Sequence, residues 1–188
     1  MKNKLDHFGL LAPFYETFIH PGDPQKLKSL VPNMPQGILL DAGGGTGRVS
    51  QFLHEKAAQI IIADESFDML RQAKKKEGIQ PVRSRTEHLP FRDGLFDCII
   101  MVDALHHVVN QLATASELWR VLKPGGRLLI EEPNFDSLRG KFIAFAEKLA
   151  LMRSHFLSPE QIIALFDNKS GNRRFEMEDT LAWIIVDK

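Results

Sequence analysis

The sequence predicts an α/β fold built on a mainly parallel, doubly wound sheet, and three observations predict it. Short apolar runs of strand length recur along residues 38–133, and stretches with a helical spacing of apolar side chains separate them. Strands that alternate with helices of about ten to twelve residues are typical of parallel sheets covered on both faces. A glycine-rich turn follows the first apolar run, as in ligand-binding connections of such sheets.

Five strands and three helices are expected in alternation along this region. The expected strands are 38–42, 59–64, 80–84, 96–103 and 127–133, and the expected helices are 46–57, 67–77 and 111–122. Ser66 is expected to cap the second of these helices, and Gly78 is expected to stop it.

The last part of the sequence departs from this alternation. Ser158, Pro159 and Glu160 form an N-cap, a first-turn proline and an acidic first turn, which predict a helix through Phe166. The segments RRFEMED and LAWIIVD follow closely on each other, which predicts an antiparallel strand pair at one sheet edge. The expected fold class is an α/β three-layer sandwich with a seven-stranded, mostly parallel sheet and one antiparallel edge strand.

Composition and charge exclude several classes of protein. The 188 residues are 44% hydrophobic and 26% charged, as in a single globular domain. The formal net charge is zero, which disfavours a polyanionic partner such as nucleic acid. Cys98 is the only cysteine, so we expect a buried core thiol, no intrachain disulfide and no metal site. No apolar run has membrane-spanning length and no signal-peptide pattern opens the chain, so a cytoplasmic protein is expected.

The glycine turn DAGGGTG (41–47) limits the class of ligand that the chain is expected to bind. Dinucleotide sites need G-x-G-x-x-G, but Arg48 or Ser50 stands where the third glycine is required. A carboxylate at Asp41 would repel a pyrophosphate and attract an ammonium or sulfonium group. The start of the expected helix 46–57 would offer backbone N–H groups to the same ligand.

Asp64 adds a second acid, at the end of the second expected strand and seventeen residues after Gly47. A carboxylate at this place accepts hydrogen bonds from ribose hydroxyls. The two acids together therefore predict a ligand that carries a ribose and a cationic group, without a pyrophosphate.

Four segments in order resemble the class I S-adenosylmethionine-dependent methyltransferases of the type 11 group, which includes the ubiquinone/menaquinone C-methyltransferases. They are DAGGGTG, ADESFDML, EHLPFRDGLFDCIIMVDALHHV and LWRVLKPGGRLLIEEP, and they cover roughly residues 36–134. The resemblance implies a Rossmann-like fold and S-adenosylmethionine as cofactor, with S-adenosylhomocysteine as product.

The resemblance also implies roles for individual residues. The methionine end of the cofactor would be held by Asp41, Gly43, Gly45, Thr46 and Gly47, and the ribose would be held by Asp64. The adenine would be bordered by Glu65, Met69 and Thr86. The sulfonium and amino group would be bordered by Val102 and Asp103. Tyr15 would close over the sulfonium from the N-terminal extension, and the alternative for it is a core tyrosine.

Arg85 is a departure from the family pattern. An acidic residue usually stands there and accepts a hydrogen bond from the adenine amino group, whereas arginine has only donors. Two alternatives follow. Arg85 turns outward, toward Glu65 or Glu87, or the adenine is held differently.

Two segments bear on the acceptor. His106 and His107 follow the fourth expected strand, at the edge where ligands bind, and are candidates for a catalytic base or a substrate ligand. The alternative for both is a polar cap on the next helix. An amphipathic helix is expected at 138–152. It is interpreted as core packing, a lid over a hydrophobic acceptor or a membrane-surface helix, which leaves a hydrophobic or aromatic acceptor and a peripheral membrane contact open.

The predicted function is enzymatic methyl transfer to a small-molecule acceptor by in-line displacement. The alternatives are a non-catalytic cofactor-binding or regulatory domain, and an RNA or protein methyltransferase. The oligomeric state stays open. One domain, 1–188, is expected, with an N-terminal extension or cover (1–36), a cofactor-binding core (37–134), a substrate-cap insertion (135–157) and a C-terminal helix and strand pair (158–188).

Overall fold

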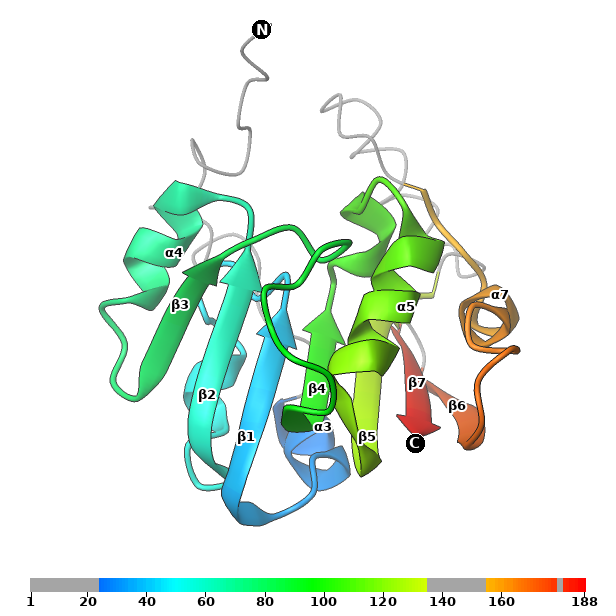
Figure 1. Cartoon of the computed structure of the whole chain (residues 1–188), viewed down its shortest axis with the longest axis horizontal. Coiled ribbons are helices and arrows are strands. Elements are labelled where there is room, and N and C mark those ends of the chain that lie inside the picture. The colour runs from blue at the N-terminus through cyan, green and yellow to red at the C-terminus, as the bar shows by residue number, and fades with distance from the viewer. Residues whose placement is uncertain (1–23, 135–154, 179–180) are drawn as a thin grey trace, which may run out of the picture.

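The computed structural model describes residues 24–134, 155–178 and 181–188, which form a sheet with helices on both faces (Figure 1). The helices are α3 (Pro24–Leu30), α4 (Phe67–Ala73), α5 (Gln111–Val121) and α7 (Pro159–Ala164). The strands are β1 (Met34–Ala42), β2 (Ala57–Asp64), β3 (Ile79–Arg83), β4 (Phe96–Val102), β5 (Leu122–Pro133), β6 (Asn172–Glu178) and β7 (Leu181–Asp187). Tyr15 and the helix expected at 138–152 lie outside the described residues.

The seven strands are ordered β3-β2-β1-β4-β5-β7-β6. β1 to β5 run parallel, and β7 is antiparallel to both of its neighbours, β5 and β6. This confirms the predicted fold class, with the antiparallel strand lying one place in from the edge that β6 forms. The order reverses direction at β1, which pairs with β2 on one side and β4 on the other. Such a point opens a crevice beyond the carboxyl ends of the strands.

Both faces of the central strands are buried, so their sequences read as continuous apolar runs. On one face, α5 and α7 pack in the cluster that contains Leu40, Ile99, Leu118, Ile162 and Ile184. On the other face, α3 and the turn after β1 pack in the cluster that contains Leu27, Leu39, Leu53, Ile100 and Trp183. α4 covers β2 and β3 through Leu70 and Ala73, which contact Ile62 and Ile79. Neighbouring residues of one strand thus enter opposite cores.

The helix expected at 46–57 does not form, so that prediction was wrong. The chain instead makes successive turns between β1 and β2, with one short 3-10 turn at Ser50–Phe52. Val49 and Leu53 are buried in the core from these turns, which is why their spacing resembled that of a helix. β2 already begins at Ala57, which leaves too little chain for the expected helix. No α-helix N-terminus therefore follows the glycine turn within residues 43–56.

The other helix predictions agree in place, and each helix ends earlier than expected. Before α7, Ser158 Oγ accepts from Gln161 N, and the Gln161 side chain accepts from Ser158 N, which is a complete capping box. Ser66 precedes α4 as predicted, but its hydroxyl makes no capping bond there. Its backbone N–H donates to Asp64 Oδ1 at 2.8 Å instead.

Because α3 begins at Pro24 and β1 at Met34, the region expected as an extension (1–36) contributes to the core of the sheet. Cys98 is fully buried in β4, and burial raises the pKa of its thiol to about 12. Among the described residues, no helix has both the length and the apolar character needed to cross a bilayer.

Candidate functional site

A cavity of about 390 Å³ lies at the carboxyl ends of the central strands, where the strand order reverses. Its walls come from the loops that follow β1, β2, β3 and β4, so four separate segments build it. Of the residues predicted from sequence, the cavity is lined by Asp41, Gly43, Gly45, Asp64, Glu65, Met69, Arg85, Thr86, Val102, Asp103 and His107.

Some predicted residues do not line this cavity. Thr46 is buried behind the loop, Gly47 packs on the sheet, and His106 is buried beside the cavity wall. Other lining residues were missed, namely Gly44, Arg48, Val49, Ser66, Ser84, Glu87, Met101, Ala104, Val108 and Val109. The only signal available for most of these is their position directly beside a predicted site residue.

Gly43 and Gly47 serve the glycine turn in different ways. Both have a φ of +73°, in the left-handed region that favours glycine. A Cβ at Gly47 would lie 2.9 Å from Ile62 Cδ1, so this glycine lets the loop rest on β2. A Cβ at Gly43 would lie 2.9 Å from Ala104 Cβ, across the cavity wall. Gly47 therefore lets the loop pack on β2, and Gly43 lets it pack against Ala104.

Asp64 ties the glycine turn to β2. Its Oδ2 accepts from Gly45 N at 3.0 Å, and its Oδ1 accepts from Ser66 N at 2.8 Å. A carboxylate oxygen has two lone pairs, so it can accept more than one hydrogen bond. Asp64 is therefore a structural clamp in addition to a candidate ligand contact, which the sequence pattern did not indicate.

Asp41 is the buried acid of the site. It is 1% exposed at the end of β1, and Ser50 Oγ donates a hydrogen bond to its Oδ2. Burial raises the pKa of Asp41 to about 6, because the Ser50 hydrogen bond and the Arg48 charge offset burial only in part. At neutral pH the group is ionised and faces the cavity as an acceptor.

Arg48 balances part of this negative charge. Its guanidinium lines the cavity with the side chain only 8% exposed, and Nη2 lies 3.4 Å from Asp103 Oδ2. Asp103 follows β4 with a φ of 54°, the only positive φ among the described residues other than glycine. Its N–H donates to Glu131 O at 2.9 Å, which holds this strained turn against β5.

Arg85 follows the first of the two alternatives and turns outward. Its side chain is 52% exposed, with Nη2 3.0 Å from Glu87 Oε1 and Nε 4.0 Å from Glu65 Oε2. Glu87 is buried and lines the cavity. Burial alone would raise its pKa, but hydrogen bonds from backbone N–H groups and the Arg85 guanidinium lower it below the usual value.

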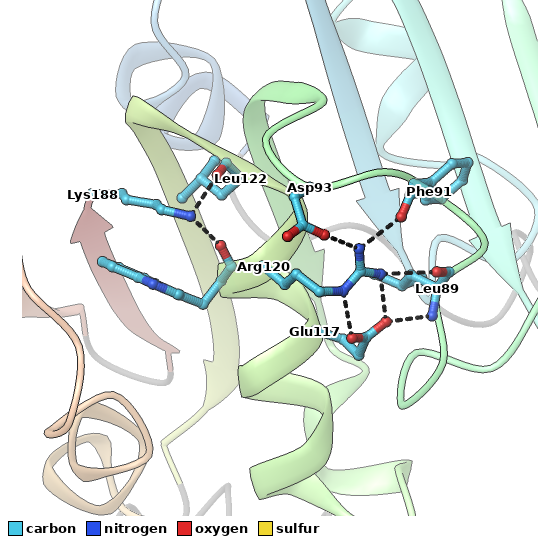
Figure 2. Close-up of polar contacts among 8 residues, drawn as sticks. Leu89, Phe91, Asp93, Glu117, Arg120, Leu122 and Lys188 are labelled. Atoms are coloured by element: carbon cyan, nitrogen blue, oxygen red, sulfur yellow. Dashed lines mark hydrogen bonds and ion pairs between the residues drawn. The ribbon is translucent and has the colours of Figure 1, made fainter.

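Figure 2 shows how the connection between β3 and β4, which carries part of the cavity wall, is fastened to α5. Arg120 Nη1 donates to Phe91 O at 2.8 Å and to Asp93 Oδ1 at 2.7 Å. Its Nη2 donates to Leu89 O at 3.1 Å. Glu117 accepts from Arg120 Nε at 2.7 Å and from Leu89 N at 2.9 Å. One side-chain pair of α5 thus holds a connection that has no regular structure.

The two candidate histidines occupy different environments. His106 is 1% exposed, with Nδ1 2.5 Å from Glu132 Oε2 at the end of β5. His107 lines the cavity and contacts His106, with ring centroids 3.9 Å apart. The alternative interpretation as a polar cap does not describe them, since Asn110 caps α5 by accepting from Ala113 N.

The site is thus an acceptor-rich cavity with Arg48 as a buried counter-charge. Asp41 ionises near pH 6, and each oxygen of Asp64 accepts one N–H from the protein. This donor and acceptor set fits a ligand that carries an ammonium group and ribose hydroxyls.

Comparison with known proteins shows which proteins the chain resembles. Residues 40–130 match the family model described as a methyltransferase domain. The ubiquinone/menaquinone biosynthesis C-methyltransferase UbiE of Haemophilus ducreyi is 36% identical over 114 residues, which cover 53% of this chain and 44% of that protein. The same enzyme of Erwinia tasmaniensis is 33% identical over 122 residues, covering 57% and 48%. The chain spans about half the length of the curated relatives it matches.

Solved structures share the whole fold. A SAM-dependent methyltransferase from Thermotoga maritima superposes with a TM-score of 0.80 at 22% identity, covering 96% of this chain and 98% of that one. The geranyl diphosphate C-methyltransferase of Streptomyces coelicolor gives 0.74 at 13% identity, covering 87% and 77%. The described sheet thus has the fold of solved S-adenosylmethionine-dependent methyltransferases, and residues 40–130 are similar to a methyltransferase domain.

Proposed function

We propose that this chain transfers a methyl group from S-adenosylmethionine to a small-molecule acceptor. The observation that carries the proposal is the cavity in which Asp41 and Asp64 face the same space beside the glycine turn. When bound, the cofactor would supply a sulfonium-activated methyl group for in-line attack by an acceptor, with S-adenosylhomocysteine as the leaving group. The protein's part is to bind, to align and to exclude water.

The cavity residues divide into three groups in this proposal. Asp41, Gly43 and Gly45 bind the methionine end, and Asp64 binds the ribose. Glu65, Met69 and Thr86 border the adenine, and Arg85, which also lines the cavity, pairs with Glu65 and Glu87. Val102 and Asp103 border the sulfonium. Thr46 and Gly47 support the loop from behind, since neither lines the cavity.

We further propose a quinone-related acceptor as the first to test. The relatives with 33–37% identity are ubiquinone/menaquinone biosynthesis C-methyltransferases. The zero net charge of the chain also favours a small molecule over a nucleic acid. A reduced quinone carries phenolic O–H groups, whose deprotonation makes both oxygen and ring carbon better nucleophiles.

Calorimetric titration with S-adenosylhomocysteine tests the cofactor. We expect binding to the wild type, about 100-fold weaker binding to Asp64→Ala, and an intermediate loss in Asp64→Asn, because the amide keeps one acceptor oxygen. Asp68→Asn is the matched control, since Asp68 is a half-exposed acid on α4. Absence of binding to the wild type, with NAD binding in its place, would refute the proposal.

Transfer of a labelled methyl group separates an enzyme from a silent binder. Reduced quinones, catechols and amines are offered with labelled S-adenosylmethionine, and transfer to one of these classes is expected. Tight binding of S-adenosylhomocysteine with no transfer to any of them would favour the non-catalytic cofactor-binding domain.

A further inference from the structure

Glu132 holds the segment after β4 through both of its carboxylate oxygens. Oε1 accepts from the backbone N–H of Ala104 at 3.2 Å and of Leu105 at 2.7 Å. Oε2 lies 2.5 Å from His106 Nδ1. Because the carboxylate acts as an acceptor toward the two backbone groups, we assign the third proton to His106 Nδ1. Glu132 thereby fixes both the ring orientation and the tautomer of His106.

His106 in turn supports His107. The two rings lie 3.9 Å apart between centroids at an interplanar angle of 50°. Phe156 packs on His106 at a centroid distance of 5.0 Å. The His106 ring is therefore held between two aromatic neighbours and the Glu132 carboxylate. Since His107 lines the cavity, a continuous set of contacts runs from the end of β5 to the cavity wall.

The backbone of this segment has other supports. Gln111 Nε2 donates to Leu105 O at 3.1 Å and to His155 O at 2.7 Å, and His155 N donates to His106 O at 2.7 Å. The segment is thus tied to α5 and to residues 155–156 independently of Glu132. The bond from Glu132 to His106 therefore adds a constraint on the ring, which the backbone contacts do not supply.

We propose that His107 is the general base of the methyl transfer and that Glu132, acting through His106, is its positioning residue. This rests on the proposed function. His107 takes the proton from the O–H, N–H or C–H bond of the acceptor. The electron pair of that bond then forms the new bond to the methyl carbon. The bond between the methyl carbon and sulfur breaks, and its electron pair stays on sulfur. The proton passes from His107 to solvent.

Two features favour His107 over Asp103 for this role. Asp103 Oδ2 lies 3.4 Å from Arg48 Nη2, so this carboxylate is already engaged in an ion pair. Imidazole titrates near neutral pH, where a general base is most effective. Glu132 orients His106 through the contact with Nδ1, and His106 packs on the proposed base His107.

Nuclear magnetic resonance of ¹⁵N-histidine-labelled protein tests the supporting contact without an acceptor. In the wild type, the His106 signals, assigned by their loss in His106→Asn, are expected to show a protonated Nδ1. In Glu132→Gln, the amide oxygen still accepts from Ala104 and Leu105, while its NH₂ group faces His106 and moves the ring proton to Nε2. A bare Nδ1 in the wild type would overturn the assignment.

Steady-state kinetics with the reduced quinone or other acceptor that is methylated tests the function. Glu132→Gln is expected to lower kcat by about 10–100-fold, and His107→Gln by about 100-fold or more. KM and the Kd for S-adenosylhomocysteine should stay within about twofold of wild type, as expected for groups that act on the acceptor proton. His54→Gln is the control, because His54 is an exposed histidine that does not line the cavity.

The outcomes separate this proposal from the proposed function. Wild-type kcat in His107→Gln, or in a folded Glu132→Gln, overturns the proposal while leaving the methyltransferase function intact. A wild type that fails to bind S-adenosylhomocysteine refutes the proposed function, whatever tautomer His106 has. If Glu132→Gln does not fold, the tautomer of His106 in the wild type and the kcat of His107→Gln still test the proposal.

Discussion

Asp41 is a carboxyl group that the fold buries, although its ionised form is more stable in water. Burial raises its pKa from 3.8 to about 6, so the folded protein binds this proton more tightly than the unfolded chain. The contribution of Asp41 to the free energy of unfolding therefore falls as pH rises from about 4 to about 6, and stays at its lower value above that. At neutral pH the protein carries a destabilising charge at the position where an ammonium group is proposed to bind.

Asp41→Asn should therefore stabilise the protein and weaken ligand binding. Near neutral pH we expect the free energy of unfolding to rise by up to about 3 kcal/mol, with the gain vanishing below about pH 4. Affinity for S-adenosylhomocysteine should fall at least about tenfold, because an amide does not pair with an ammonium group. Urea denaturation across pH, with calorimetry, measures both. Asp167→Asn is the exposed control, and a destabilised Asp41→Asn at neutral pH would contradict the argument.

The connection between β3 and β4 shows how an irregular element is kept in place. It has no repeating backbone pattern, yet it supplies Thr86 and Glu87 to the cavity. Its anchor is the pair of Arg120 and Glu117 on α5, which binds its carbonyl oxygens and its backbone N–H (Figure 2). The two carboxylates beside Arg120, Glu117 and Asp93, raise the pKa of its guanidinium, so the anchor stays charged at any working pH.

Arg120→Ala should release this connection. We expect a loss of about 1–3 kcal/mol in the free energy of unfolding, because carbonyl oxygens lose their charged donor, and a several-fold weaker binding of S-adenosylhomocysteine. Urea denaturation and calorimetry measure the two effects. Arg71→Ala, which removes an exposed arginine paired with Asp68 on α4, should change stability by no more than about 0.5 kcal/mol. Unchanged ligand affinity in Arg120→Ala would show that the connection is held by other contacts.

At the scale of the molecule, the cavity exists only when four parallel strands are in register. Its lining comes from segments that extend from Asp41 to Val109, and no single segment could bind the ligand alone. A ligand of this cavity therefore binds the folded chain and not the unfolded one.

Binding should accordingly stabilise the whole fold. S-adenosylhomocysteine at 100 times its Kd is expected to raise the free energy of unfolding by about 2.7 kcal/mol. Thermal melting at increasing ligand concentration measures this, and Asp64→Ala should show little of the shift at the same concentrations. A melting temperature that does not respond to a ligand detected by calorimetry would mean that the ligand binds the unfolded chain as well as the folded one.

Much of the fold could be predicted from local pattern. The strands are continuous apolar runs because both of their faces are buried, and each was found within a few residues. The capping box at Ser158 is a local hydrogen-bond motif and was equally readable. The helix expected at 46–57 failed because the turns found there bury Val49 and Leu53 at the same spacing.

The sequence by itself determined the sheet, the glycine turn and the two acids that end β1 and β2, since each depends on residues close together in the chain. Only the tertiary structure decided that Arg85 turns outward, that Asp64 clamps Gly45, and that Glu132 holds His106 across 26 residues. Such contacts join segments that meet only when the strands have paired. Side-chain orientation is set by those neighbours, and no local pattern encodes it.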